Sequence, residues 1–144
     1  MRPAFGLPQA LTILIFVGGI VTVTLKYASI NVNHYVDSYT REQAELFMQS
    51  ATEAALLRIG TFDRSGGGCL RELNVTSPDQ RFNALVRVER YYLADGSGCT
   101  NVPYTPITYT PSHGMLSMRV VVTTASGAKV LHPIRLERRS LQRP

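Results

Sequence analysis

The chain has 144 residues, of which 44% are hydrophobic and 17% charged, and its formal net charge is +5. This length holds one domain, or one small domain with a long additional element, and leaves little room for a second full domain. The charge is uneven, because residues 27–63 carry two basic and five acidic side chains whereas residues 64–144 carry eleven basic and five acidic ones. The basic part is either a solvated surface or one that attracts acidic partners, such as nucleic acid, lipid headgroups or the acidic segment of another copy.

A run of 21 residues without a charged side chain extends from Phe5 to Leu25 and is rich in Leu, Ile, Val and Phe. As a helix it would span about 30 Å, which is the thickness of the hydrocarbon layer of a membrane. A secretory signal would have several basic residues, a shorter apolar core and a small-x-small cleavage site after it. This run lacks those features, so we predict a membrane-spanning segment at residues 5–26.

The helical pattern continues beyond Lys26, because apolar and aromatic side chains recur at spacings of three to four, with acids and glutamines between them. Residues 40–59 are rich in good helix formers, and Gly60 is a suitable C-terminal stop. We therefore expect one helix over about residues 5–59, with its amphipathic half at residues 27–60. Such a helix would be roughly 80 Å long, which a compact monomer of this size cannot cover.

After the helix the period of the pattern changes to two, which indicates β-strands. Alternating runs separated by glycine-rich turns are expected at residues 69–75, 81–93, 115–124 and 129–141. The last is the weakest, because Pro133 removes a ladder donor and suits an edge strand. The predicted fold is α+β, a long N-terminal helix packed on a C-terminal antiparallel sheet of about four strands, with a globular β domain at residues 61–144. The amphipathic half of the helix is the element expected to cover the apolar face of the sheet.

The opening residues resemble the N-terminal motif of the type IV pilin and type II secretion pseudopilin superfamily. That motif is a short basic leader ending in Gly or Ala, then Phe, a small residue, Leu, an apolar residue or Pro, and Glu, followed by an apolar helix. In "RPAFGLPQALTIL", Arg2 matches the charge of the leader, Ala4 the residue before the cut, and Phe5 the mature N-terminus, whose amine is methylated in family members. The resemblance implies that residues 1–4 are a leader peptide removed by a prepilin peptidase.

The resemblance also implies a function, that of a structural subunit of a bacterial type IV pilus-like filament or secretion pseudopilus. Such a subunit is anchored in the inner membrane before assembly and then polymerises with pilin-like subunits into an extracytoplasmic or cell-surface filament. The subunit would be neither an enzyme nor the holder of a cofactor or metal. Two alternatives are a permanently anchored single-pass protein, with an extracytoplasmic binding domain or as part of a secretion apparatus, and a secreted module that loses the apolar segment.

Gln9 stands where the family usually has glutamate. In the family, that carboxylate neutralises the N-terminal amine of a neighbouring subunit inside the apolar filament core, where an unpaired charge is strongly unfavourable. Glutamine can accept a hydrogen bond from the ammonium group but cannot neutralise it. Gln9 is therefore the predicted assembly residue, and it indicates either a minor, tip-type subunit or a lineage that neutralises the amine in another way.

Cys69 and Cys99 are the two cysteines, and a polar, glycine-rich stretch separates them. The sequence has no C-x-x-C or H-x-x-x-H motif, so it predicts no metal site. If this part of the chain lies outside the cytoplasm, we expect one disulfide, which would stabilise the fold by about 3 kcal/mol.

Asn74 lies in "ELNVT", which matches the bacterial asparagine glycosylation pattern of an acidic residue two positions before the asparagine and a hydroxyl two positions after it. The alternative is a strand and turn that match the pattern by chance.

Arg135, Arg138 and Arg139 form a basic run near the end of the sequence. If a neighbouring strand adds the arginines and tyrosines of "RVERYY" at residues 87–92, the cluster could hold DNA phosphates or another anionic partner and stack on bases. The alternatives are an exposed basic strand, or contacts to the acidic helix segment of another subunit. The histidines have no Ser, Asp or Cys near them in a recognisable catalytic pattern, so we predict no catalytic residue.

Overall fold

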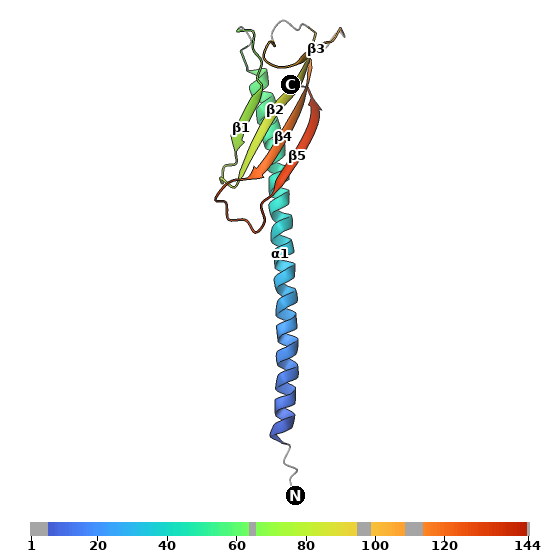
Figure 1. The fold of residues 1–144 in the computed structure, drawn as a ribbon, viewed down its shortest axis with the longest axis vertical. Helices are drawn as coiled ribbons and strands as arrows, with labels where there is room; N and C mark the ends of the chain where they lie inside the picture. The colour runs from blue at the N-terminus through green and yellow to red at the C-terminus, as the bar shows by residue number, and fades with distance from the viewer. Residues whose placement is uncertain (1–5, 64–65, 95–98, 109–113, 144) are drawn as a thin grey trace. The chain divides into compact units, whose positions relative to one another are not determined.

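The computed structural model describes residues 6–63, 66–94, 99–108 and 114–143 (Figure 1). Its elements, in chain order, are helix α1 (Leu7–Gly60) and strands β1 (Glu72–Thr76), β2 (Phe82–Leu93), β3 (Tyr104–Pro106), β4 (Met115–Thr124) and β5 (Arg135–Gln142). The predicted α+β class, one long N-terminal helix with an antiparallel sheet, is confirmed. The chain divides into two units, residues 1–39 and residues 40–144, and α1 contributes to both.

The sheet is a meander of four antiparallel strands with one short addition. The strands follow the order β1-β2-β4-β5, and each neighbouring pair is antiparallel. The addition is β3, which the sequence did not predict and which pairs in parallel with Tyr91, Tyr92 and Leu93 at the end of β2. Because Pro103 precedes β3 and Pro106 is its last residue, two ladder donors are missing and the strand is only three residues long.

Alternating side chains give the sheet an apolar inner face. In β2 and β4, eight side chains at alternate positions are at most 3% exposed, as the period of two predicts: Phe82, Ala84, Val86, Val88, Leu116, Met118, Val120 and Val122. The edge strands add the partly buried side chains of Leu73, Val75 and Leu136. An apolar face of this size requires a cover.

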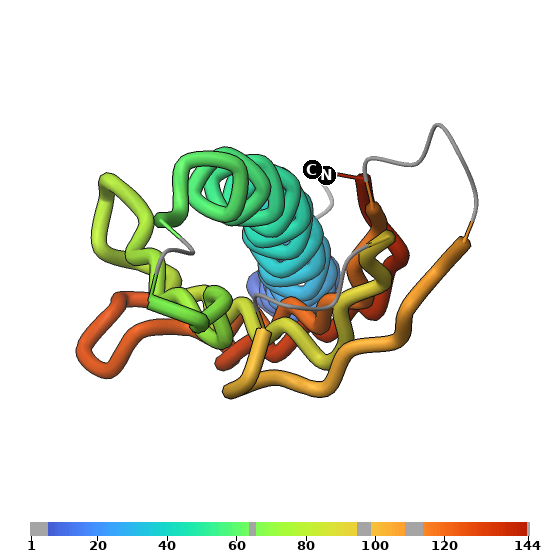
Figure 2. Tube along the Cα trace, turned by 90° about the horizontal axis from the view of Figure 1, so that it is seen from above, coloured from blue at the N-terminus to red at the C-terminus, as the bar shows by residue number. Residues whose placement is uncertain are grey.

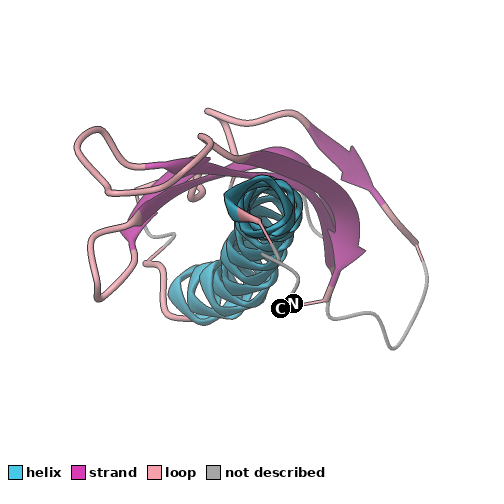
Figure 3. Cartoon of the chain, turned by 90° about the horizontal axis from the view of Figure 1, so that it is seen from below, coloured by secondary structure: helices cyan, strands magenta, loops and turns pink. Residues whose placement is uncertain are grey.

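The C-terminal part of α1 provides that cover. Its buried positions recur at spacings of three and four and begin at Thr40: Thr40, Ala44, Met48, Ala51, Ala55 and Ile59. The three alanines have no exposed surface and belong to the same core cluster as the buried side chains of the strands. Figures 2 and 3 show the sheet curving along one side of this end of the helix. Phe47 adds a stacked ring contact with Phe82, with ring centroids 6.3 Å apart.

A β-bulge in β2 changes which side chains face the core. The ladder with β4 skips Glu89, so this residue is extra on its strand. Beyond the bulge the buried position is Tyr91, whereas uninterrupted alternation would place Tyr92 inside. The side chain of Tyr91 is 2% exposed, and its hydroxyl donates a hydrogen bond to the carbonyl oxygen of Leu70 at 2.7 Å. Tyr91 is therefore a core residue.

Ser77 and Asp79 hold the turn between β1 and β2. The Ser77 hydroxyl donates to the Asp79 carboxylate at 2.5 Å and accepts from the backbone N–H of Phe82 at 2.9 Å. The same carboxylate accepts from the backbone N–H of Arg81 at 3.2 Å. The hydrogen bond from Ser77, followed by that from Arg81, lowers the pKa of Asp79 below its usual value of 3.8.

Asp79 should make the stability of the domain depend on pH. Because the pKa of its carboxyl is lowered in the folded state, the contribution is fully present above 3.8 and is lost as the pH falls through the lower folded value. We expect the free energy of unfolding of the wild type to fall more steeply below about pH 4 than that of Asp79→Ala. Urea titration of the full chain in detergent measures both, and parallel pH profiles would contradict the prediction.

The burial of three alanines of α1 against the sheet leads to a second prediction. Ala51→Leu adds a branched side chain at a position with no exposed surface, and overpacking of this kind costs about 1–3 kcal/mol. Ala54→Leu makes the same change on the exposed side of α1 and is the matched control. We expect urea unfolding of the full chain in detergent, followed by near-ultraviolet circular dichroism, to show destabilisation in Ala51→Leu alone. Equal stability of the two variants would contradict close packing of helix and sheet.

Candidate functional site

The first part of α1 is an exposed apolar surface. From Leu7 to Leu25 the large apolar side chains are 48–80% exposed, and α1 is long and apolar enough to cross a membrane. Besides Gln9, the polar side chains of this stretch are threonines, and each donates its hydroxyl to a carbonyl oxygen three or four positions earlier, at 2.8–3.1 Å: Thr12, Thr22 and Thr24. These hydroxyls are satisfied within the helix, as the interior of a bilayer requires.

Gly18 and Gly19 lie in the middle of this apolar surface. A Cβ atom added at either position would meet nothing within 4 Å among the described residues, apart from the adjacent backbone of the helix itself. No intrachain contact therefore requires glycine there, although each glycine costs about 1 kcal/mol relative to alanine in a water-exposed helix. Small residues in the middle of a membrane helix allow another helix to approach closely.

The exposed surface extends beyond the uncharged run. Residues 27–39, which the sequence pattern assigns to the amphipathic half, carry a further set of exposed apolar and aromatic side chains: Tyr27, Ile30, Val32, Tyr35, Val36 and Tyr39. Burial in α1 begins only at Thr40. The exposed apolar surface of α1 therefore reaches Tyr39, beyond the uncharged run that ends at Leu25.

The predicted processing residues, Ala4 and Phe5, lie outside the described residues. Gln9 lies in the first turn of α1 with its side chain exposed, and its backbone N–H donates to the carbonyl oxygen of Gly6 at 2.8 Å. That turn contains no acidic residue. The described part of the first turn therefore offers no carboxylate to an amine or to the positive end of the helix dipole.

Cys69 and Cys99 form the predicted disulfide, and both are at most 2% exposed. The side chain of Asn101 supports this link at two points, because its Oδ1 accepts from the backbone N–H of Cys69 at 2.8 Å and its Nδ2 donates to the Cys69 carbonyl oxygen at 2.9 Å. The segments that precede β1 and β3 are thereby held together. Within the described ranges, no group of three or more His, Cys, Asp or Glu side chains is placed to hold a metal ion.

The outer face of the sheet arranges its side chains in rows that cross β1, β2, β4 and β5. One row is Glu72, Arg87, Arg119 and Arg139. The next is Asn74, Leu85, Val121 and Glu137. The third is Thr76, Asn83, Thr123 and Arg135. An apolar pair in the middle row is therefore bordered by polar rows on both sides.

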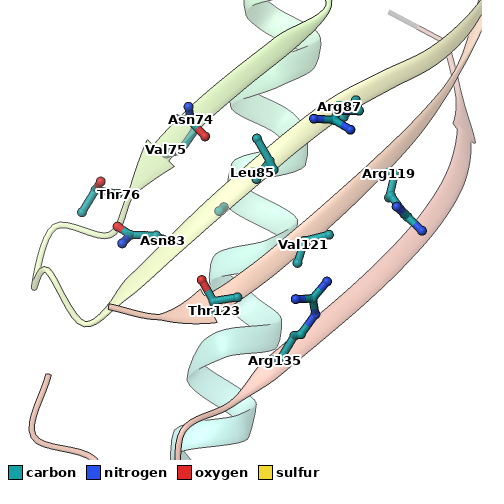
Figure 4. Close-up of a pocket in the computed structure, with 11 residues that line it drawn as sticks. Asn74, Val75, Thr76, Asn83, Leu85, Arg87, Arg119, Val121, Thr123 and Arg135 are labelled. Carbon is teal, nitrogen blue, oxygen red and sulfur yellow. The ribbon is translucent and has the colours of Figure 1, made fainter. Parts of the chain in front are cut away.

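A depression of about 610 Å³ lies over these rows (Figure 4). Leu85 and Val121 form its apolar floor, and three arginines reach its border: Arg87, Arg119 and Arg135. Asparagine and threonine side chains of the first three strands of the meander line the rest: Asn74, Thr76, Asn83 and Thr123. The depression, hereafter the outer depression, combines an apolar floor with hydrogen-bonding groups around it.

Glutamates balance much of the positive charge on the outer face. Four ion pairs join its arginines to three glutamates: Arg87–Glu72 at 3.0 Å, Arg119–Glu137 at 2.7 Å, Arg135–Glu137 at 3.9 Å and Arg139–Glu89 at 3.1 Å. Because these side chains are partly exposed to water, each pair stabilises the fold by at most about 1 kcal/mol. Their larger effect is electrostatic, because they leave the face only weakly basic.

The three arginines predicted as an anionic-partner site do not share one surface. Arg138 is opposite Val120, whose side chain is buried on the inner face, so Arg138 lies on the helix side of β5. Arg135 and Arg139 lie on the outer face, and both are ion-paired. Tyr91, expected to stack on bases, is in the core. A continuous stripe for a phosphate backbone is therefore not formed by these residues.

The arginines have partners that were not predicted from the sequence, namely Glu72, Glu89 and Glu137. The signal for Glu137 was its position, since it lies two residues from both Arg135 and Arg139 and so shares their strand face.

No protein-family model matches the chain, and no curated protein or solved structure matches it either.

Glu137 is expected to limit binding of phosphate polymers to the outer face. Glu137→Gln leaves Arg119 and Arg135 without this carboxylate, which should tighten binding of double-stranded DNA by roughly two- to fivefold. Glu53→Gln makes the same change in net charge on the exposed side of α1 and is the control. Fluorescence anisotropy of labelled DNA with the full chain in detergent, at several salt concentrations, measures the effect. An equal change in both variants would contradict a local role for Glu137.

Proposed function

We propose that this chain is a structural subunit of a bacterial type IV pilus-like filament or secretion pseudopilus, anchored in the inner membrane before assembly. The observation that carries the proposal is the continuity of α1, in which residues 7–39 are exposed and largely apolar while the residues from Thr40 onward are built into the sheet domain. A bilayer can cover the exposed part in a monomer, and the helices of neighbouring subunits can cover it in a polymer. The motif "RPAFGLPQ" supports the same conclusion.

Assembly would exchange one apolar environment for another. Lipid tails and neighbouring helices are both apolar, so the exchange gains little from the hydrophobic effect, and the net free energy has to come from packing and from the assembly machinery. Gly18 and Gly19 provide space for such packing, since no side chain in the described part of the chain lies within 4 Å of where their Cβ atoms would be. The threonine hydroxyls, already bonded within the helix, do not oppose the exchange.

Gln9 supports placement of the subunit at the filament tip, as a minor component. In the family, the residue at this position neutralises the amine of the next subunit, whereas the exposed amide of Gln9 can accept a hydrogen bond from an amine but carries no negative charge. The described first turn contains no acidic residue that could supply the missing carboxylate. A subunit that has glutamine instead of glutamate here is suited to the filament tip, where this residue does not have to neutralise the N-terminal amine of another subunit.

The sheet domain is proposed to lie outside the cytoplasm. Its disulfide is the kind of bond that persists in oxidising compartments and is rare in the cytosol. The role is structural, with pilin-like subunits and a prepilin peptidase as partners, and it uses no cofactor. The weak positive charge of the outer face does not favour DNA as its surface ligand.

The mature N-terminus tests the proposal. Mass spectrometry of the full chain purified from native membranes or surface filaments should show loss of residues 1–4 and a methylated amine on Phe5. Ala4→Gly should be processed at least as well, whereas Ala4→Leu should accumulate as the precursor because the resemblance requires a small residue before the cut.

An intact Met1 in the native protein would overturn the proposal and favour a permanently anchored single-pass protein. Gln9→Glu tests the tip assignment separately, because restoring the carboxylate should increase incorporation along the filament. Unchanged incorporation and position of Gln9→Glu, measured by immunogold labelling, would contradict that assignment.

A further inference from the structure

We propose that Asn74 is N-glycosylated and that the first sugars of the glycan lie in the outer depression. The proposal rests on the extracytoplasmic placement of the sheet domain given above. It starts from the position of the motif, because "ELNVT" is the whole of β1, with Asn74 at its centre. In this strand Glu72, Asn74 and Thr76 are exposed while Leu73 and Val75 point inward, so the acidic residue, the acceptor and the hydroxyl share one accessible face.

The acceptor is open to an enzyme. β1 lies at an edge of the sheet, paired with β2 alone among the described strands. Within the part of the chain that the structure describes, no hydrogen bond or ion pair engages the side chains of Asn74 and Thr76. The carboxylate of Glu72 forms an ion pair with Arg87 at 3.0 Å. All three motif side chains project from the five residues of β1, at the edge of the sheet.

The reaction is a glycosyl transfer from a lipid-linked glycosyl pyrophosphate. The Nδ2 atom of Asn74 forms a bond to the anomeric carbon of the sugar while the bond from that carbon to the pyrophosphate oxygen breaks. The amide loses one proton to a base of the transferase, and the lipid pyrophosphate leaves with the electron pair. No oxidant or reductant is needed.

The outer depression gives the attached sugar a place to lie. Asn74 pairs across the ladder with Leu85, and Leu85 with Val121, so the apolar floor begins directly beside the acceptor (Figure 4). A sugar ring has an apolar C–H face and a rim of hydroxyls, which match an apolar floor bordered by amide, hydroxyl and guanidinium groups. Asn83 and Arg119 are such border groups on the strands that carry the floor.

The glycan would also change how the edge of the sheet behaves. An edge strand with exposed N–H and C=O groups is a site for unwanted pairing with other chains, and bulky or charged groups at the edge oppose it. A saccharide on β1 would shield this edge and cover the apolar floor of the outer depression.

Peptide mass spectrometry of the full chain from its native membranes tests the modification. Cleavage after Arg71, Arg81 and Arg87 releases residues 72–81, with Asn74 as their only asparagine, and residues 82–87, with Asn83 as theirs. We expect a saccharide mass on the first peptide and none on the second. An unmodified first peptide would overturn the proposal, whereas the mature N-terminus in the same sample reports on the filament assignment independently.

Matched variants separate the motif from the fold. The saccharide mass should be lost in Asn74→Gln and in Thr76→Val, which keeps the shape of the side chain, and should be retained in Thr76→Ser and Asn83→Gln. Persistence of the mass in Asn74→Gln or in Thr76→Val would overturn the assignment of the site.

A second readout tests where the glycan lies. Methyl resonances of Leu85 and Val121 should differ between the native glycoprotein and Asn74→Gln, because the sugar contacts the floor in the first and is absent in the second. The methyl resonances of Val86 and Val120, on the inner face, should not change and are the control. Identical Leu85 and Val121 resonances in both proteins would overturn the placement of the sugar in the depression.

Discussion

The contact between the alanine-rich face of α1 and the inner face of the sheet is the interaction on which the domain depends. Each buried Val, Leu, Met or Phe contributes about 1.5–3 kcal/mol only while it is shielded from water, and in the described chain α1 is the helix that shields those of β2 and β4. Because the covering residues belong to the same helix as residues 7–39, the sheet domain cannot separate from the apolar segment unless α1 is broken. A membrane or a neighbouring helix that binds the apolar segment therefore also anchors the sheet domain.

The two faces of the sheet differ in composition and in what they contact. The inner face is filled by apolar side chains and fixes the position of the helix. The outer face has no such cover, and its ion pairs across neighbouring strands favour one register, since a shift by one residue would move the arginines and glutamates to the inner face. The same pairs keep the face close to neutral, so it attracts a polyanion only weakly.

Much of the fold follows from local pattern. The long helix and the apolar faces of β2 and β4 were predictable because they depend on simple periodicity, and the disulfide was predictable because the sequence has two cysteines. The bulge at Glu89 was not, because it is defined by the register of β2 against β4, which the sequence of β2 alone does not give. The three-residue β3 was also missed, since its prolines oppose a strand and only pairing with β2 creates it.

The candidate surface was less predictable than the fold for a related reason. Arg135, Arg138 and Arg139 look like one cluster in the sequence, but strand parity sends Arg138 to the opposite face. The neutralisation of Arg135 and Arg139 depends on Glu137 of β5 and Glu89 of β2, which the register brings beside them. The position of Asn74 in a strand, by contrast, followed from alternation. The structure adds that the outer depression lies beside it.

The disulfide has a mechanical consequence. Cys69 precedes β1 and Cys99 follows β2, so the covalent path from α1 to the later strands can pass from one cysteine to the other without running through either strand. Tension that enters the sheet domain from α1 is thus carried by a sulfur–sulfur bond past β1 and β2, which are not unzipped by it. The strands that a pulling force can peel are those that follow Cys99, namely β3, β4 and β5, whereas the pairing of β1 with β2 is kept while the chain is under load.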